Sequence, residues 1–208
     1  MFRGPTPVVT NILIINIIVF LLQLIFSEVE PYLILEKVNW VIKRDPDLMK
    51  TLPEFNFIQW LTYAFMHGGF LHILFNSIAL YGLGSMVEMT IGSRRFIEFY
   101  LICAIGAGIV TSIFDPNPYP VLGASAAIAG VAIAFAVLYP NNELILFPIP
   151  IPIRAKYLIW GSFVISFVLG VVLPLINSGY GDGISHFGHF AGMLVAAIYV
   201  AYFRYLKR

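Results

Sequence analysis

This sequence has few charged residues. Asp, Glu, Lys and Arg make up 11% of its 208 residues, against roughly 25% in soluble domains, while 60% are hydrophobic. The formal net charge of +1 favours neither nucleic acid nor an acidic partner. A single cysteine, Cys103, excludes a disulfide framework and a cysteine-based metal site. These shortages, together with long apolar runs, indicate a polytopic helical membrane protein in contact with the lipid bilayer.

Six apolar segments are long enough to be membrane spans, because about 20 helical residues cross the hydrocarbon core. Within an expected single domain of residues 1–208, they lie at about 8–27, 70–89, 95–114, 124–140, 156–174 and 187–205. The first run has no convincing small-x-small cleavage site after it, so we interpret it as a retained span. Every second residue of segment 147–152 is proline, so this segment is expected not to be helical.

A long first loop, residues 28–69, separates the first two spans. It mixes acidic and basic residues with apolar and aromatic ones, namely Tyr32, Leu33, Leu35, Trp40 and Phe57. This mixture suggests amphipathic pieces that lie at the membrane interface. Four of the twelve Lys and Arg residues are in this loop, and the other eight fall on one side if the N-terminus is inside. The positive-inside bias therefore predicts that both termini are cytoplasmic.

This topology brings polar residues of three spans to one depth near the outer side. They are His72 and Asn76 in the second span, Ser125 in the fourth and His189 in the sixth. Polar groups at membrane depth are costly and face a protein interior or a wet cavity. We therefore expect these four side chains to converge.

Ser125 opens the fourth span after a Pro-rich loop that ends at Gly123. The free N–H groups of a helix start stabilise negative charge, which makes Ser125 a candidate nucleophile. Serine is also a preferred helix cap, and base rates alone favour that interpretation. From Ser125 to Tyr139 the helix rises ~22 Å, less than the core of roughly 30 Å. We therefore expect Ser125 to lie below the outer surface and the preceding loop to dip into the protein.

A serine hydroxyl needs a neighbouring base to act as a nucleophile. His189 is the best candidate, because the small residues around it permit close helix approach; a hydrogen bond between helices is an equally good interpretation. His72 and Asn76 are four residues apart and share a helix face, so both can donate toward one oxyanion, or simply bond between helices. No carboxylate is expected at this depth, which leaves a Ser–His dyad.

A metal site is the main chemical alternative. All four histidines, including His67 and His186, lie toward the outer side. The sequence has no His-Glu-x-x-His pattern, cysteine cluster or nearby carboxylate to complete a metal site, so this interpretation is the weaker one.

Four motifs, each on its expected helix, resemble those of rhomboid intramembrane serine proteases. They are His72-Ile-Leu-Phe-Asn76, then Gly82-Leu-Gly84 with Glu88, then Gly123-Ala-Ser125, then His189-Phe-Ala-Gly192. The six-span plan with a long first loop resembles the prokaryotic form of the family. The resemblance implies an all-α bundle with Ser125 as nucleophile, His189 as general base, and His72, Asn76, Gly123 and the Ser125 N–H around the oxyanion.

The resemblance also implies an activity and a location. Family members cleave transmembrane segments of substrate proteins near their outer end, without a metal or other cofactor. A bacterial or archaeal plasma membrane is the expected location. The fifth span and residues 175–185 resemble the elements proposed to gate substrate entry. Protonation of the base should lower activity, so we expect the rate to fall at a pH low enough to protonate His189.

The sequence departs from the family pattern at several positions. Ala126 replaces the glycine that usually follows the serine, and Ala129 replaces an aromatic residue that commonly stacks on the catalytic histidine. Ala196 replaces the second glycine of the motif in the last span, and the Trp-Arg pair often seen in the first loop is missing. Two other functions remain as alternatives: a non-catalytic protein of this fold that binds transmembrane helices, and a small transporter or metal-handling membrane protein.

Overall fold

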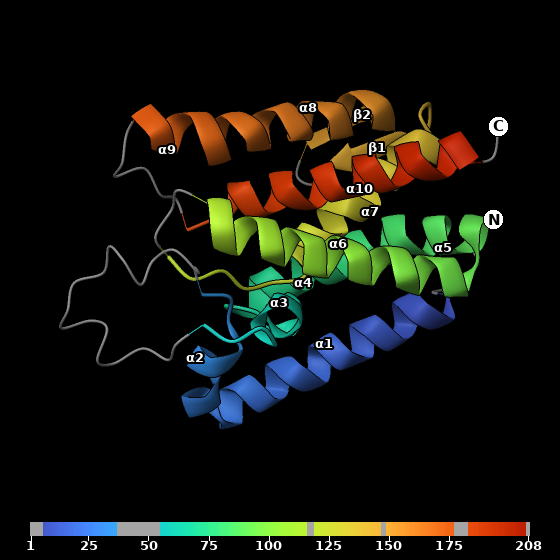
Figure 1. Ribbon diagram of the computed structural model, residues 1–208. Coiled ribbons are helices and arrows are strands. Elements are labelled where there is room, and N and C mark those ends of the chain that lie inside the picture. Colours follow the sequence, from blue (N-terminus) through green and yellow to red (C-terminus); the bar gives the residue numbers. More distant parts are fainter. Residues whose placement is uncertain (1–5, 37–54, 116–118, 147–148, 177–182, 207–208) are drawn as a thin grey trace.

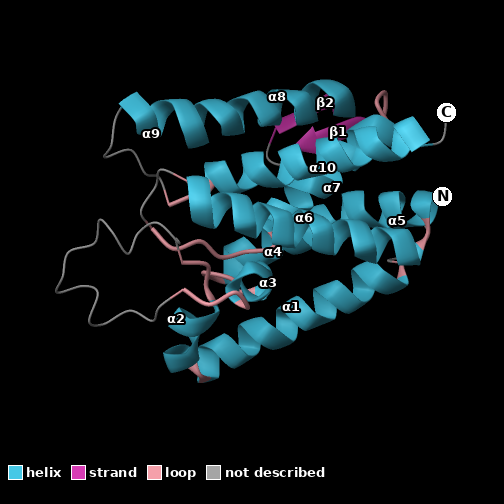
Figure 2. Ribbon diagram, in the orientation of Figure 1, coloured by secondary structure: helices cyan, strands magenta, loops and turns pink. Residues whose placement is uncertain are grey.

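The computed structural model describes residues 6–36, 55–115, 119–146, 149–176 and 183–206, which form a bundle of long helices (Figures 1 and 2). In chain order the elements are α1 Pro7–Ile25, η1 Ser27–Val29, α2 Glu30–Leu33, α3 Gln59–Thr62, η4 Tyr63–Phe65, α4 Phe70–Ala79, η5 Leu80–Gly84, α5 Ser85–Ile91, α6 Ser93–Phe114, α7 Ser125–Leu138, β1 Glu143–Leu146, β2 Ile149–Arg154, α8 Ala155–Phe167, η6 Val168–Val172, α9 Leu173–Ile176 and α10 His186–Leu206.

Helices cover all six segments in which a span was expected. Among the described residues, four continuous helices are long and apolar enough to cross a membrane: 7–25, 70–91, 93–114 and 155–176. The second and fourth of these each contain one π-helical turn, η5 and η6. The apolar helices 125–138 and 186–202 are shorter. The expected all-α polytopic architecture is therefore confirmed.

One element was not predicted, a β-hairpin between α7 and α8. β1 pairs with β2 in antiparallel register, with Glu143 opposite Arg154 and Leu144 opposite Ile153. The described part of segment 147–152 is extended, as the prolines required, because a proline lacks the N–H group that a helix needs. An alternating Ile-Pro pattern can still form a short two-stranded pair, since each strand of a hairpin is an edge strand.

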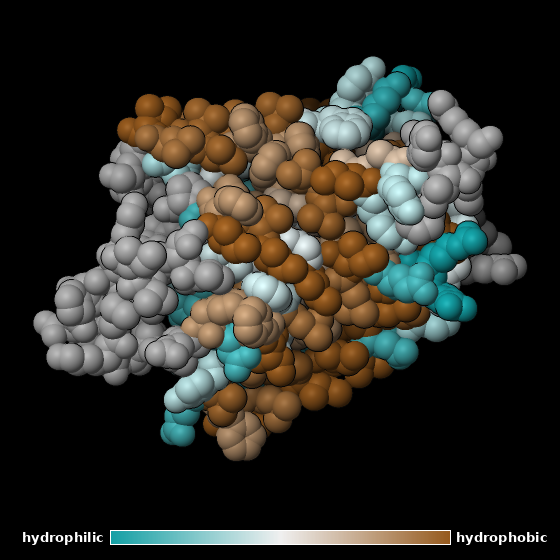
Figure 3. All heavy atoms as spheres, viewed as in Figure 1, coloured by the Kyte–Doolittle hydropathy of each residue, from teal (hydrophilic) through white to brown (hydrophobic). Residues whose placement is uncertain are grey.

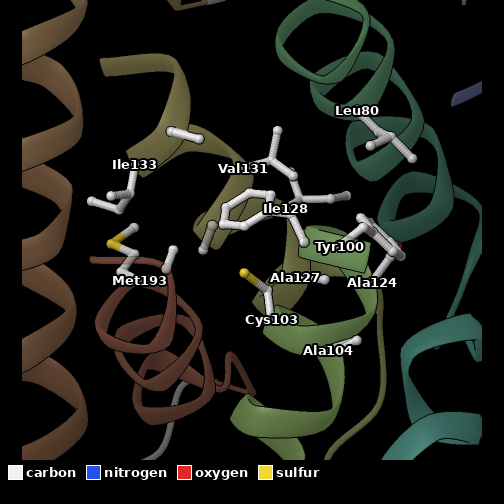
Figure 4. Close-up of a cluster of buried hydrophobic side chains, with 14 of the residues drawn as sticks. Leu80, Tyr100, Cys103, Ala104, Ala124, Ala127, Ile128, Val131, Ile133 and Met193 are labelled. Carbon is white, nitrogen blue, oxygen red and sulfur yellow. The ribbon is translucent and has the colours of Figure 1, made fainter. Parts of the chain in front are cut away.

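The short helix α7 lies at the centre of the bundle. Ten of its residues are buried, and α10 and α6 pack most extensively against it. Figure 4 shows side chains of α7, α6 and α10 meeting in this core, among them Ala127, Val131, Cys103 and Met193. The small residues of α7 let its neighbours approach closely, which is how helices associate when lipid supplies no hydrophobic driving force between them.

The outer helices carry the apolar surface. Large hydrophobic side chains are exposed along α1 and α8, and the visible face of the molecule is predominantly hydrophobic (Figure 3). Such a surface suits contact with lipid chains and not with water. Hydrophilic side chains gather at the end of the bundle where α1 begins and α10 ends (Figures 1 and 3).

The starts of α4, α7 and α10 lie close together. A Cβ at Gly123, just before α7, would be 2.7 Å from His72 Nε2 in the first turn of α4, and Ser125 Oγ is 2.8 Å from His189 Nε2 in the first turn of α10. This arrangement brings the starts of three helices that are far apart in the sequence to one level, as the six-span topology required.

A buried carboxylate secures the first helix at the other end. Glu88, in α5, accepts hydrogen bonds from the Val8 and Val9 N–H groups at 3.1 and 2.9 Å and from the Ser93 hydroxyl at 2.6 Å. The Thr6 hydroxyl is a further donor. A negative charge is favourable at a helix N-terminus, where backbone N–H groups lack partners. Glu88 therefore fastens the start of α1 to α5 and α6.

Candidate active site

The loop before α7 is held inside the protein. Val121 forms a two-way backbone bridge with Leu35, at 2.8 and 3.0 Å, and the Gly123 N–H donates to the Tyr63 carbonyl at 2.8 Å. Gly123 has φ +123°, a conformation that side-chain-bearing residues rarely adopt. The expected dip of this loop into the protein is therefore present, with Val121, Gly123 and Ala124 buried.

Ser125 is the first residue of α7, and its hydroxyl does not cap the helix. The residue in the capping position is Ala124, and α7 has no side-chain capping bond. Ser125 Oγ instead lies 2.8 Å from His189 Nε2. The helix rises ~21 Å over its 14 residues, about 12 Å less than α6. At the other end the two helices are level, because Tyr139, just after α7, contacts Thr90, three residues before α6 begins. Ser125 is therefore recessed relative to the far end of α6.

His189 reaches Ser125 because α10 lies directly against the first turn of α7. Gly192 makes this contact possible: a Cβ there would be 1.9 Å from the Ala126 carbonyl oxygen. One helical turn separates His189 from Gly192, and Ser125 adjoins Ala126, so the close approach also sets the distance between hydroxyl and imidazole. Gly130 supports the same crossing, since its Cβ would be 3.0 Å from the Gly192 carbonyl oxygen.

His72 lies on the other side of Gly123. A Cβ at Gly123 would be 2.7 Å from His72 Nε2 and 3.6 Å from Ser125 Oγ, so the glycine leaves room for both side chains. The Gly68 N–H donates to His72 Nδ1 at 3.4 Å. Because Nδ1 accepts this bond, the proton of the neutral ring is on Nε2, the nitrogen that lies against Gly123. The structure therefore brings Ser125, His189, His72 and Gly123 together.

Asn76 lies one turn after His72 on the same helix face, as expected. Its side chain is buried, and among the described residues its Nδ2 has no hydrogen-bond partner. A buried donor without a partner costs about 1–3 kcal/mol. An amide kept in this state at the level of His72 is available to donate to a bound group.

Each of the two remaining histidines packs against one of the site histidines. His67 packs edge-on against His72, with ring centroids 5.2 Å apart, and His186 packs edge-on against His189 at 6.2 Å. Burial lowers the pKa of His67 to about 4, so this ring is neutral at physiological pH. Within the described ranges, no three His, Cys, Asp or Glu side chains group in a way that could hold a metal ion.

Three positions that support the site were not predicted to do so. Leu35 was assigned to the membrane interface, yet it is fully buried and pairs with Val121. Tyr63 supplies the carbonyl that holds Gly123. Gln23 binds the backbone of His67, and its position in an apolar run was the one available signal, since a polar residue in a span is usually functional. Trp40 and part of the proposed gate, residues 177–182, lie outside the described residues.

Comparisons with known proteins identify the family of this chain. A family model described as the rhomboid domain matches residues 54–206, which is more than half of the chain. The rhomboid protease GluP of Bacillus subtilis is 33% identical over 138 residues, 64% of this chain and 24% of the relative. The rhomboid protease AarA of Providencia stuartii is 28% identical over 150 residues, 64% of this chain and 51% of the relative.

A third relative is the rhomboid protease GlpG of Klebsiella pneumoniae. It is 34% identical over 110 residues, which is 52% of this chain and 36% of the relative. The chain thus spans from about a quarter to about half of the length of these three relatives. The match of the rhomboid model to the chain from the first loop to the last helix, with the apolar helices of the fold, shows that this multi-pass integral membrane protein belongs to the rhomboid family.

Proposed function

We propose that the chain is an intramembrane serine endopeptidase, which cleaves transmembrane segments of membrane-embedded substrate proteins near their outer end. The observation that carries the proposal is the 2.8 Å contact between Ser125 Oγ and His189 Nε2. A serine becomes a nucleophile when an adjacent base accepts its proton. The relatives named as proteases support the same class of reaction.

The reaction begins with neutral His189. Its Nε2 accepts the Ser125 proton while Oγ forms a bond to the carbonyl carbon of the scissile peptide, whose C=O bond becomes an oxyanion. The intermediate collapses, the C–N bond breaks, and the leaving nitrogen takes the proton from His189. A water molecule, deprotonated by the same imidazole, then hydrolyses the ester on Ser125 and restores the hydroxyl.

The oxyanion is held by donors from α4 and α7. His72 offers Nε2–H, which the Gly68 bond to Nδ1 keeps protonated. Asn76 offers an amide without another partner among the described residues. The Ser125 N–H is the first of α7, where backbone N–H groups have no partner within the helix. Gly123 lets His72 approach Ser125, since a Cβ at this position would be 2.7 Å from His72 Nε2. Donors already in place at a developing charge are commonly the largest catalytic contribution.

The decisive experiment uses the full chain, purified in detergent and returned to lipid vesicles, with a model protein that has one transmembrane segment. We expect cleavage within or beside that segment by the wild type and none by Ser125→Ala. A fluorophosphonate should label the wild type and leave Ser125→Ala unlabelled. Labelling that persists in Ser125→Ala would sink the serine mechanism. Substrate capture without cleavage by the wild type would instead favour the non-catalytic, helix-binding alternative.

The proposed orientation has its own test. Both termini are placed in the cytoplasm and the site on the outer side of a bacterial or archaeal plasma membrane, because the described basic residues outside the first loop lie where α6 and α8 begin and where α10 ends, at the end of the bundle opposite the site. A cysteine-reactive probe that does not cross membranes should reach Tyr119→Cys, an exposed position in the loop that leads to Ser125, in intact cells, while the same substitution at Arg94 should stay unreacted. The reverse pattern would invert the topology.

A further inference from the structure

One peptide unit, between His67 and Gly68, connects the first helix to the proposed oxyanion site. Its carbonyl accepts a hydrogen bond from Gln23 Nε2 at 3.3 Å, and its N–H donates to His72 Nδ1 at 3.4 Å. A trans peptide is planar, with its C=O and N–H pointing in opposite directions. A side chain that holds the carbonyl therefore also aims the N–H. We propose that Gln23 is a positioning residue that sets the tautomer and orientation of His72, an inference that rests on the proposed function.

Gln23 binds both peptide units that flank His67. Its Oε1 accepts from the His67 N–H at 2.9 Å, while its Nε2 donates to the His67 carbonyl. The two bonds fix which end of the amide is which, because only Oε1 can accept and only Nε2 can donate. Glu30 Oε2, at 3.4 Å, is a second acceptor for Nε2. Every polar atom of the side chain is thus engaged.

The Gln23 amide is buried, although it lies in a helix with a lipid-facing surface. It is 9% exposed near the end of α1, where the neighbouring Leu22 and Leu24 are 46% and 67% exposed on the lipid-facing side. A polar side chain is costly in a span and is normally kept for a purpose. In this helix the purpose is to hold the turn that precedes α4.

The consequence for His72 follows from its two ring nitrogens. With Nδ1 accepting from Gly68, the ring proton is on Nε2, which faces Gly123 and Ser125. If the peptide rotates, Nδ1 loses its donor and the ring can carry its proton there instead. Nε2 would then present a lone pair to the oxyanion and repel it. At 3.4 Å the bond is near the limit for a hydrogen bond, so a shift of a few tenths of an ångström breaks it.

Gln23→Leu tests the proposal, with Asn16→Leu as the matched control. Asn16 is a buried amide two turns earlier on the same helix, and its Oδ1 has no partner among the described residues. We expect Gln23→Leu to lower kcat at least tenfold with KM within about twofold, and Asn16→Leu to keep both. In a His72→Ala background, Gln23→Leu should cause no further loss, because the two residues act as one unit. An equal loss in both backgrounds, or an unchanged kcat, would overturn the proposal.

A second readout does not depend on activity. Nitrogen-15 spectra of histidine-labelled protein, with the His72 signals assigned through His72→Gln, report which ring nitrogen carries the proton. We expect the Nε2–H form in the wild type and a mixture in Gln23→Leu. Gln23→Glu serves if the leucine variant does not fold, since it keeps the acceptor for the His67 N–H and lacks the amide donor. An unchanged tautomer in a folded Gln23 variant refutes the positioning role, whereas absence of Ser125-dependent cleavage in the wild type refutes only the proposed function.

Discussion

Gly192→Ala should separate the two groups on which the proposed chemistry depends. The added Cβ would be 1.9 Å from the Ala126 carbonyl oxygen, and real Cβ contacts are essentially never shorter than 3.0 Å. The Ala126 carbonyl oxygen is a backbone atom and cannot rotate away as a flexible side chain would. The helix α10 must therefore move away from α7 by more than about 1 Å. His189 is one turn from Gly192 and rides on the same helix. Its 2.8 Å contact with Ser125 would then stretch beyond hydrogen-bonding distance.

A displacement of this size has two measurable effects. Misplacing catalytic groups by about 1 Å can cost on the order of 10²-fold in rate, so we expect kcat to fall about 100-fold or more. Overpacking a close contact costs about 1–3 kcal/mol of unfolding free energy, so the variant should fold but melt earlier. Cleavage of a transmembrane substrate at several concentrations, with thermal unfolding in the same detergent, measures both quantities.

Gly161→Ala is the matched control. It makes the same substitution in α8, where a Cβ would meet nothing within 4 Å and the backbone is helical. Its kcat should equal that of the wild type, with stability unchanged or slightly raised by the better helix propensity of alanine. Wild-type turnover in Gly192→Ala would refute the inference that this contact positions His189. An equal loss in both variants would show that the effect is not specific to the helix crossing.

Three further predictions concern single side chains. Asn76→Ala should slow turnover by ~10²–10³ while the protein stays folded, as for other oxyanion donors; a wild-type rate would remove Asn76 from the site. Glu88→Gln should lower the free energy of unfolding by about 2 kcal/mol, because its carboxylate accepts several hydrogen bonds; unchanged denaturation in detergent would contradict this. Burial lowers the pKa of His67 to about 4, so unfolding releases the ring to bind a proton and stability should fall from about pH 6.5 to about pH 4. His67→Phe should show a shallower decline than the wild type, and parallel curves would refute this.

The helices and the level of the site were predictable because both follow from apolar run length and helix direction. Residues 8–27 were expected to span and α1 covers Pro7–Ile25; Ser125 was expected to open a helix and does so. These features depend on local sequence, so no contact had to be known. The loop that carries Leu35 was different, because a hydrophobic residue in a charged stretch fits an interface as well as a core. Only the bridge to Val121 decides between them.

Whether the Ser125 hydroxyl caps α7 or contacts another group could not be decided from Ser125 alone, since a serine at the start of a helix fits both cases. The deciding feature is the distance between two residues 64 apart in sequence, and that distance depends on Gly192. A glycine in a helix indicates close packing, but it does not identify the residue that packs against it. The β-hairpin was missed for a related reason: proline excludes a helix, but what replaces it depends on the strand alongside.

The alanine that follows Ser125 departs from the family pattern, and its effect depends on which of its atoms contact α10. Gly192 packs on the carbonyl oxygen of Ala126, and the backbone presents this atom whatever the side chain at position 126. The Ala126 methyl instead belongs to a separate buried cluster with Ala107, Phe187 and Ala191. A methyl group that fills space there adds about 0.8 kcal/mol of burial and leaves the helix crossing unchanged. The substitution that threatens the Ser125–His189 contact is therefore one at Gly192 and not the one that this chain already carries at Ala126.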